Sequence, residues 1–312
     1  MKNQNWAHGI DRQAYRDAIA TGIGATIDNG ATTQELRHLA TVLKRRDLSP
    51  RQRATYSDAF GRGLQFLLAM QYPSGGFPQF FPPKSPTHYS RHITLNDDAT
   101  VAVLQLLHDV ALRRTPYEAV PLADSLRSAS ADAFQRGLRC LLDCQIQKDG
   151  QLTVWCQQHD ELTLRPAQGR AYELPSFSGC GESVRVLQLL MQFDLQDPLV
   201  QPCATRICLA VHAGVSWLWS HRIEGMRLER FTNADGLPDQ RFVPDSHSQT
   251  VYLARFYDLT SERPFYCDRD GQPRSRLADI GYERRNGYAW LRPFPMQLMQ
   301  QYEEWRTLNL GR

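Results

Sequence analysis

The chain has 312 residues, 42% of them hydrophobic, and its net charge is only +3. This length allows one large domain or two small ones, and the low charge without a basic run disfavours nucleic-acid binding. No stretch of about 18 apolar residues occurs, so we expect no membrane-spanning helix and no membrane partner.

The basic residues are dominated by arginine, because four of the 36 are lysines and the other 32 are arginines. Arginine pairs with carboxylates through two parallel hydrogen bonds, which suits a carboxylate-rich ligand. A genome rich in GC codons would produce the same excess, so only individually placed arginines carry an argument. The seven cysteines contain no CxxC pair, which disfavours a zinc site, and we expect most of them to be buried.

One class of helix is predicted by an internal repeat. Residues 59–76 and 133–150 share the frame Ala-Phe-x-Arg-Gly-Leu-x-x-Leu-Leu-x-x-Gln, followed by a turn that ends in glycine, and a weaker copy spans 212–225. The leucines recur at helical spacing. The copies align at one glycine each: Gly63, Gly137 and Gly214.

A second class of helix alternates with these copies. Residues 98–107 and 182–190 both contain Val-Leu-Gln-Leu-Leu, and related patterns fill 32–43 and 248–259. Their apolar residues lie on more than one helical face, so we expect buried inner helices. The alternation predicts an all-α fold, an α/α toroid with long loops and minor short strands; an irregular helical bundle is the alternative. No low-complexity linker divides the chain, so we expect a single domain over residues 1–312.

Polar segments precede the predicted inner helices. They are 26–30, 94–98 and, before the third helix, 170–173 followed by 178–183. If the inner helices run in one direction, these segments lie at the same mouth of the toroid. Asp97 and Asp98 suit a helix N-terminus, and Asp28 suits a turn. Their carboxylates would also suit a hard cation such as calcium or magnesium.

Arginines and aromatic residues are interleaved in 254–271 and 280–290. Guanidinium groups pair with carboxylates, and aromatic faces can stack on sugar rings, so the pattern suits an acidic polysaccharide. A surface tail that wraps the core through salt bridges is the alternative.

Seven motifs follow one another along most of the chain: TIDNGATT (26–33), GGFPQFFP (75–82), HITLNDDAT (92–100), RAYELPSFSG (170–179), ARFYDL (254–259), RPFYCDRDG (263–271) and IGYERRNGYAW (280–290). Together they resemble the family 10 pectate lyases. The resemblance implies an (α/α)3 toroid and an enzyme that cleaves α-1,4-linked polygalacturonate by calcium-assisted anti β-elimination, giving 4,5-unsaturated products. We expect a secreted or periplasmic monomer with polygalacturonate as its partner, although no signal peptide is visible at Met1–Gly9.

The resemblance also implies roles for single residues. Arg170 would abstract the proton, and Asp28 and Asp97 would be catalytic acids that bind Ca²⁺ together with Asp98. The substrate-binding residues would be Arg255, Arg269, Tyr172, Asn286 and Trp290. Because a guanidinium has a pKa above about 12, an arginine base predicts an alkaline optimum.

The sequence departs from the family pattern in several places. Phe77 stands where the family usually carries tryptophan, and 178–183 and 245–252 look altered. The family's N-terminal GGWPK-like segment is not recognisable, so we expect 1–25 to be a shortened or variable start.

Two other functions stay open. A non-catalytic pectin-binding protein of the same fold would keep Arg255 and Arg269 and tolerate loss of Arg170. A glycoside hydrolase of the α/α type would need two carboxylates about 5–10 Å apart, which Asp28 and Asp97 could supply.

Overall fold

A computed structural model describes residues 24–310, and the chain divides into two compact units. Unit 1 comprises the described residues up to Asp143, with Asp160–Leu164 and Gln196–Cys203. Unit 2 comprises Cys144–His159, Arg165–Leu195 and the described residues from Ala204 onward. The single domain over 1–312 stays a prediction, and nearly all of the variable start expected at 1–25 lies outside the described residues.

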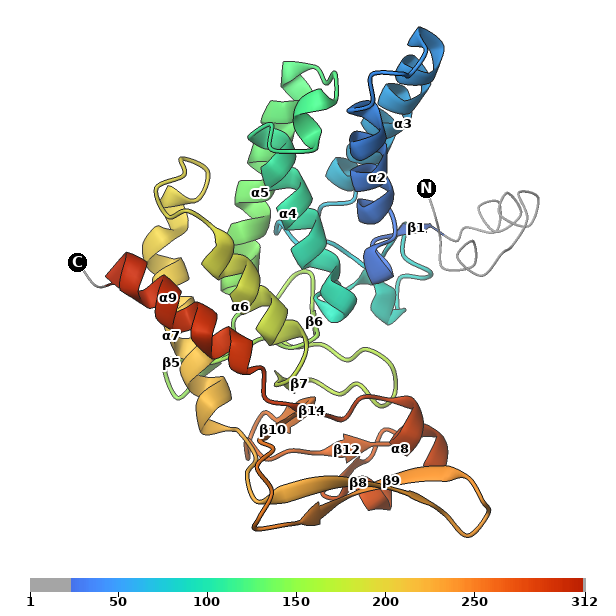
Figure 1. The fold of residues 1–312 in the computed structure, drawn as a ribbon, viewed down its shortest axis with the longest axis vertical. Helices are drawn as coiled ribbons and strands as arrows, with labels where there is room; N and C mark the ends of the chain where they lie inside the picture. Colours follow the sequence, from blue (N-terminus) through green and yellow to red (C-terminus); the bar gives the residue numbers. More distant parts are fainter. Residues whose placement is uncertain (1–23, 311–312) are drawn as a thin grey trace. The chain divides into compact units, whose positions relative to one another are not determined.

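Two helix pairs form the body of unit 1 (Figure 1). They are α2 (Thr33–Leu43) with α3 (Pro50–Ala69), and α4 (Ala99–Ala111) with α5 (Asp124–Asp143). Ser49 is the N-cap residue of α3, and its side chain accepts a hydrogen bond from the backbone of Gln52 in a capping box. Pro50 occupies the first position of the helix. Leu64 and Leu67 are fully buried, which places the predicted apolar stripe in the core.

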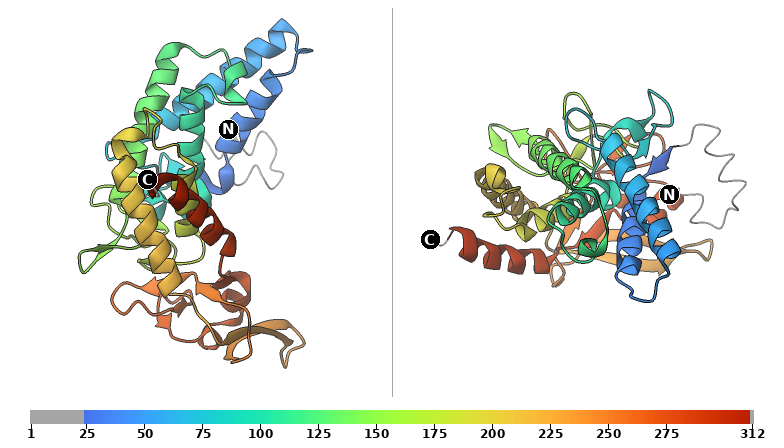
Figure 2. Two further views of the ribbon diagram at one scale, coloured as in Figure 1. Left: turned by 60° about the vertical axis from the view of Figure 1, so that its left-hand side comes forward. Right: turned by 90° about the horizontal axis from the view of Figure 1, so that it is seen from above.

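Unit 2 contains a third helix pair, α6 (Glu182–Gln192) with α7 (Ala204–Ser220), and α9 (Met296–Leu310) also packs on α6 (Figures 1 and 2). The aligned glycines allow a close helix–helix contact in all three pairs. An added Cβ would lie under 3.0 Å from a leucine of the paired helix, at Gly63 against Leu36, Gly137 against Leu104 and Gly214 against Leu187. The repeat therefore marks places where two helices approach too closely for any side chain.

Short elements complete unit 1. They are strands β1 (Ala25–Thr26), β2 (Phe80–Phe81) and β3 (Ile93–Thr94) and turns η2 (Asp28–Gly30), η3 (Tyr89–Arg91), η4 (Asn96–Asp98), η5 (Tyr117–Ala119) and η6 (Gln201–Cys203). Strands β1 and β2 pair antiparallel.

Much of unit 2 is built from short strands. They are β4 (Gln147–Lys148), β5 (Gln151–Leu152), β6 (Gln158–His159), β7 (Ser176–Ser178), β8 (Met226–Thr232), β9 (Pro238–Pro244), β10 (Tyr252–Ala254), β11 (Phe256–Asp258), β12 (Tyr266–Cys267), β13 (Pro273–Arg274) and β14 (Leu291–Pro293), with turn η7 (Leu277–Asp279) and the short helix α8 (Tyr282–Gly287). Antiparallel pairs join β4 with β5, β7 with β11, β8 with β9, β10 with β14, and β12 with β13.

The predicted all-α toroid is therefore wrong, because the fold mixes helices with many small sheets. The clearest failure is 248–259, predicted as an inner helix, where β10 and β11 form instead. Every residue from Tyr252 to Tyr257 is buried. A short apolar run buried on both faces has no period that separates strand from helix, and its aromatic residues favour the strand.

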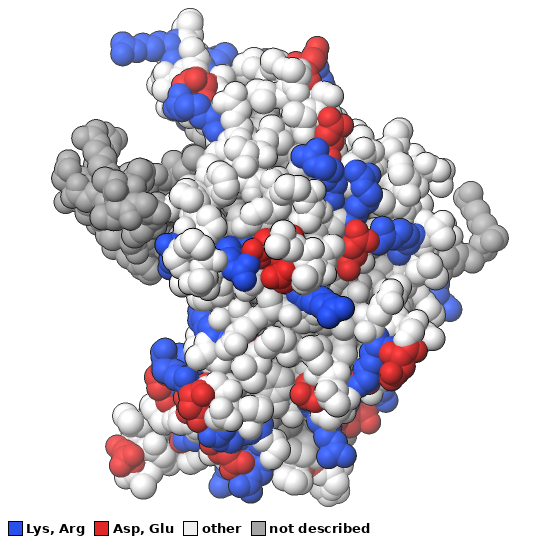
Figure 3. Space-filling model, turned by 180° about the vertical axis from the view of Figure 1, so that it is seen from behind, with Lys and Arg blue, Asp and Glu red and all other residues white. Residues whose placement is uncertain are grey.

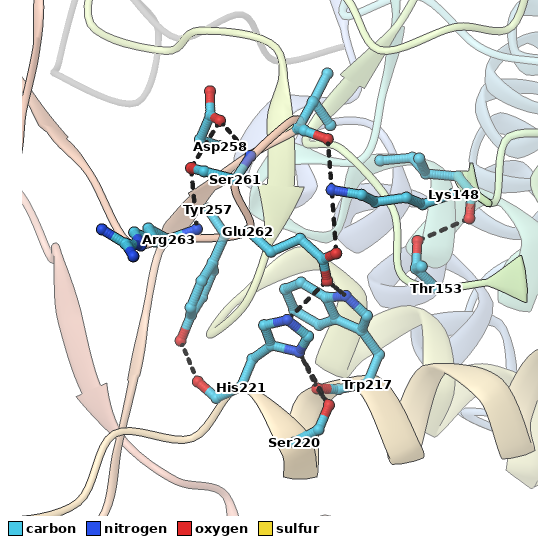
Figure 4. A network of polar contacts seen from close by, with 12 residues as sticks. Lys148, Thr153, Trp217, Ser220, His221, Tyr257, Asp258, Ser261, Glu262 and Arg263 are labelled. Carbon is cyan, nitrogen blue, oxygen red and sulfur yellow. Dashed lines mark hydrogen bonds and ion pairs between the residues drawn. The ribbon is translucent and has the colours of Figure 1, made fainter.

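Helix α7 ends in a polar network around Glu262 (Figure 4). The Glu262 carboxylate lies 3.1 Å from Lys148 Nζ and 2.7 Å from His221 Nε2, and it accepts a hydrogen bond of 3.1 Å from Trp217 Nε1. The rings of Trp217 and His221 stack with centroids 3.9 Å apart. These contacts fix the end of α7 against the loop that follows β11.

Charged side chains of both signs are interspersed on the face drawn in Figure 3, which agrees with the low net charge. No helix within 24–310 is both long enough and apolar enough to cross a membrane. All seven cysteines are free thiols, and six of them are buried, as predicted.

Candidate active site

Two turns of unit 1 have matching sequences and backbones. TIDNGATT at 26–33 and TLNDDATV at 94–101 place η2 and η4 in contact, each just before a helix. Asn29 and Asp97 have φ values of 50° and 51°, and Gly30 and Asp98 have φ values of 70° and 60°. Consecutive left-handed residues other than glycine are uncommon and cost free energy. Strain at Asp97 and Asp98 is therefore consistent with a functional turn.

The capping explanation does not account for these aspartates. Asp98 occupies the N-cap position of α4, but its side chain makes no capping hydrogen bond. Asp97 lies one residue earlier, and Asn96 donates a hydrogen bond of 2.6 Å to its Oδ2. A capping hydrogen bond therefore does not explain why Asp98 stands at the start of α4.

A cavity of about 240 Å³ opens between the two turns. Its lining is rich in oxygen-bearing groups: Asn29, Thr33, Gln34, Asp97 and Asp98, together with Arg37. Asp28 lies in the same pair of turns but is only 1% exposed, with its backbone N–H bonded to Thr26 Oγ1 at 3.0 Å. Two carboxylates at one cavity are a donor set that suits a hard cation.

A second acidic group in unit 1 has a different character. His92, Asp160 and Glu161 bring possible ligand atoms within 4.8 Å of one another. Arg91 already pairs with Glu161, and its Nη1 lies 3.9 Å from Asp160 Oδ2. Because a guanidinium occupies the position of a cation, we interpret this group as an ion-pair cluster.

The predicted base lies in a tight turn of unit 2. Glu173 N–H bonds to the Arg170 carbonyl at 2.9 Å, and Arg170 N–H bonds to Glu173 Oε2 at 2.8 Å. Glu173 is 2% exposed, and its Oε1 lies 3.2 Å from Arg170 Nη1 and accepts a 2.9 Å hydrogen bond from Tyr288. The Arg170 side chain is 37% exposed. Glu173 thus holds both the backbone and the side chain of Arg170 while solvent still reaches the guanidinium.

Two tyrosine rings and three guanidinium groups surround this turn. Tyr172 and Tyr288 meet edge to face with centroids 5.2 Å apart. Arg255 lies 4.5 Å from the Tyr288 ring centroid, and Arg284 and Arg269 lie 4.6 and 6.0 Å from that of Tyr172. The structure therefore brings the predicted residues Arg170, Tyr172, Arg255 and Arg269 into one cluster, which we call the arginine–tyrosine cluster.

The members of this cluster differ in exposure. Arg255 is buried and binds Glu182 at 2.8 Å. Burial is the largest single effect and opposes its charge, but Glu182 together with Tyr288, Cys180 and Glu173 outweighs it, so the pKa of Arg255 is raised. Arg269 is exposed and binds Glu283 through two hydrogen bonds of 3.0 Å. Hydrogen bonds from Arg269 and Arg284 lower the pKa of Glu283 to about 2.

Asn286 and Trp290, predicted to bind substrate, have structural partners. Asn286 Nδ2 donates to Asp239 at 2.9 Å and to the Tyr282 carbonyl at 3.0 Å. Trp290 is 2% exposed and donates to the Arg284 carbonyl at 2.9 Å. Both residues border a cavity beside the β8–β9 hairpin.

Sequence reasoning missed the roles of Glu173, Arg284 and Tyr288. All three stand inside recognised motifs, RAYELPSFSG and IGYERRNGYAW, so a residue-by-residue reading of those motifs could have found them. That the aspartates of unit 1 and the cluster of unit 2 share one mouth stays a prediction.

The profile of the pectic acid lyase family matches residues 1–299. The chain belongs to this family. Two solved structures of the family 10 polysaccharide lyase from Cellvibrio cellulosa are similar at 34% sequence identity and a TM-score of 0.77. The match covers 90% of this chain and 82% of a mutant of that enzyme in complex with trigalacturonic acid, and 90% of this chain and 81% of the second structure. No curated protein matches. The chain is thus a pectate lyase of family 10, an enzyme that acts on polysaccharides.

Proposed function

We propose that this pectate lyase cleaves α-1,4-linked polygalacturonate by calcium-assisted anti β-elimination, with Arg170 as the base. The arginine–tyrosine cluster is the observation that carries the proposal. Its exposed guanidinium groups, those of Arg170 and Arg269, can pair with the carboxylates of a uronate polymer, and its tyrosine rings hold the neighbouring arginines in place. The similar enzyme from Cellvibrio cellulosa was solved in complex with trigalacturonic acid, which is a short form of this polymer.

The reaction removes the proton on C5, next to the uronate carboxylate. The electron pair of that C–H bond forms the C4–C5 double bond, and the C4–O bond breaks to release the preceding sugar, whose oxygen keeps the electron pair of the broken bond and takes up a proton. No water is consumed, so the product carries a 4,5-unsaturated end. Arg170 would accept the proton, with Glu173 fixing where the guanidine points. Because a carboxylate favours the charged form of its arginine partner, we expect activity to rise toward alkaline pH.

The other arginines of the cluster have separate roles in this proposal. Arg269 is exposed enough to bind a substrate carboxylate in place of Glu283. Arg255 is too buried to reach the polymer directly, so its charge would act by holding Glu182 and the Tyr288 ring. Tyr172 is only 5% exposed and lies against Arg269 and Arg284, so its ring would act by positioning those two arginines.

Asp97 and Asp98 would hold Ca²⁺ in the cavity between η2 and η4, and the buried Asp28 would shape the facing turn. The oxygen donors of that cavity fit the ligand preference of Ca²⁺. A bound calcium ion supplies positive charge that offsets the charge developing on the uronate during proton removal. We propose that the enzyme is a monomer and that it acts outside the cytoplasm, where it would meet its polymeric substrate.

The test follows the ultraviolet absorbance of the conjugated double bond while the enzyme acts on polygalacturonate at alkaline pH with calcium. We expect Arg170→Ala to lower kcat by at least about a hundredfold, as loss of a general base does, and Arg170→Lys to recover part of it. The matched control is Arg263→Ala, an exposed arginine that belongs to none of the contacts described above.

Three other outcomes would each contradict a part of this proposal. Polymer binding without any double bond, in the unaltered enzyme, would indicate a binding protein. New reducing ends without the absorbance change would indicate hydrolysis. An unaltered rate in Arg170→Ala would remove Arg170 as the base while leaving the lyase activity in place.

A further inference from the structure

A cavity of about 320 Å³ lies in unit 2 between the β8–β9 hairpin and the segment that follows α8. Leu228, Arg230 and Gln240 line it from the hairpin, and the segment from Asn286 to Leu291 lines the facing side. Residues Arg230 and Gln240 are directly paired across the two strands, so both belong to one face of the hairpin. The cavity combines a guanidinium, two side-chain amides and aromatic groups.

The charges around this cavity favour an anion. None of the described residues that line it is acidic. Asp239, which precedes the lining residue Gln240, is 6% exposed and is held by two hydrogen bonds of 2.7 Å from Arg285. Hydrogen bonding from Arg285 keeps the pKa of Asp239 far below its usual value, and the guanidinium of Arg285 offsets the negative charge of this carboxylate.

Arg230 differs from the other arginines of the hairpin. Arg241 pairs with Glu229, and Arg227 lies 3.2 Å from Asp245. Arg230 is exposed and makes no ion pair among residues 24–310. A guanidinium that lies at the edge of a cavity and has no carboxylate partner in the protein can pair with a carboxylate of a ligand.

Hydrogen bonds hold the hairpin beside this cavity, and Tyr288 connects the cavity to the candidate active site. Gln240 Nε2 donates to the Arg285 carbonyl, and Tyr282 donates to the Pro238 carbonyl at 3.0 Å, so α8 holds the hairpin in place. Tyr288 lines the cavity, and its hydroxyl donates to Glu173, which holds Arg170. The Tyr288 ring and the Glu173 carboxylate therefore connect this cavity to the proposed base.

We propose that this cavity is an additional subsite that binds one galacturonate unit of a longer substrate, away from the bond that is cleaved. The uronate carboxylate would pair with Arg230, and the sugar hydroxyl groups would meet the amide oxygens of Gln240 and Asn286. The assignment rests on the proposed reaction, because that reaction names the polymer. The proposed subsite extends the substrate-binding surface to the β8–β9 hairpin, which lies outside all seven sequence motifs.

The experiment measures kcat and KM on galacturonate oligomers of increasing length and on the polymer, for the unaltered enzyme, Arg230→Ala and Arg241→Ala. Arg241 lies on the same hairpin but does not line the cavity, so it is the matched control. We expect Arg230→Ala to raise KM by about tenfold on the polymer, the effect of losing one charge-assisted hydrogen bond. Its kcat and its KM on the shortest cleaved oligomer should not change, and Arg241→Ala should match the unaltered enzyme.

The same KM increase at every oligomer length, or equal effects of the two variants, would overturn the subsite. Equilibrium binding of the polymer, measured by calorimetry, keeps the test independent of the reaction. If the unaltered protein shows no lyase activity, weaker binding by Arg230→Ala alone still supports the subsite, and equal binding by both variants removes it.

Discussion

Removal of the carboxylate that faces Arg255 should destabilise unit 2 strongly. Glu182 and Arg255 have side chains 4% and 10% exposed, with Oε1 and Nη2 2.8 Å apart. Loss of one partner from such a pair leaves a buried charge uncompensated and costs roughly 3–5 kcal/mol. Glu182→Gln keeps the side-chain volume, so the cost is electrostatic and no cavity is created.

The assay is thermal unfolding followed by calorimetry near neutral pH. For a chain of this size about 1 kcal/mol corresponds to roughly 2 °C in Tm, so we expect a fall of about 6–10 °C. The control is Glu303→Gln, which removes an equally short pair of 2.7 Å with Arg306 that is 54% exposed on both sides. Water and salt screen that pair, so its removal should change Tm little.

Similar falls in Tm for the two variants would refute this reasoning. A second check replaces both partners with leucine, Glu182→Leu with Arg255→Leu. Because no charge is then left without its partner, the double variant should lose less stability than the sum of the single changes.

Calcium binding and acid stability offer two further measurements. Asp97→Asn removes a carboxylate from the cavity between η2 and η4, so the calcium concentration for half-maximal activity should rise by roughly tenfold or more. Chelator should abolish the activity of the unaltered enzyme. Activity that persists in chelator would contradict the assignment. Burial works against the charge of Glu262, but Lys148, Trp217 and His221 outweigh it and lower its pKa. The stability from Glu262 is present above the unfolded pKa of about 4.3 and is lost as pH falls through the lower folded pKa. Glu262→Gln should therefore flatten the acid side of a plot of Tm against pH, and an unchanged acid side would count against this contact.

The helix pairs could be predicted because a single buried stripe leaves a period in the sequence. The leucines around Gly63 and Gly137 showed that stripe, and the repeated glycine marked the close helix contact without revealing its cause. The strands could not be predicted in the same way. Residues 252–257 are buried on both faces, and the partners of β10 and β11 are far away in the chain, at β14 and β7.

The candidate site was predictable only as a set of residues. Motifs identified Arg170, Arg255 and Arg269, and the structure brings these three into one cluster. The burial of Arg255 could not be predicted from the motifs, because its partner Glu182 lies at the start of α6, 73 residues away along the chain. A motif names chemistry, whereas the exposure of a guanidinium is a property of packing.

The matching turns η2 and η4 also bear on how such an enzyme could lose its activity. At the same left-handed position one copy carries Gly30 and the other carries Asp98. The aspartate holds a backbone conformation that costs on the order of 1 kcal/mol more for an L-residue than for glycine. Drift toward glycine in the second copy would make the turn easier to fold while removing a carboxylate from the cavity. We therefore expect a relative with glycine at this position to be the more stable protein, with one carboxylate fewer in the cavity.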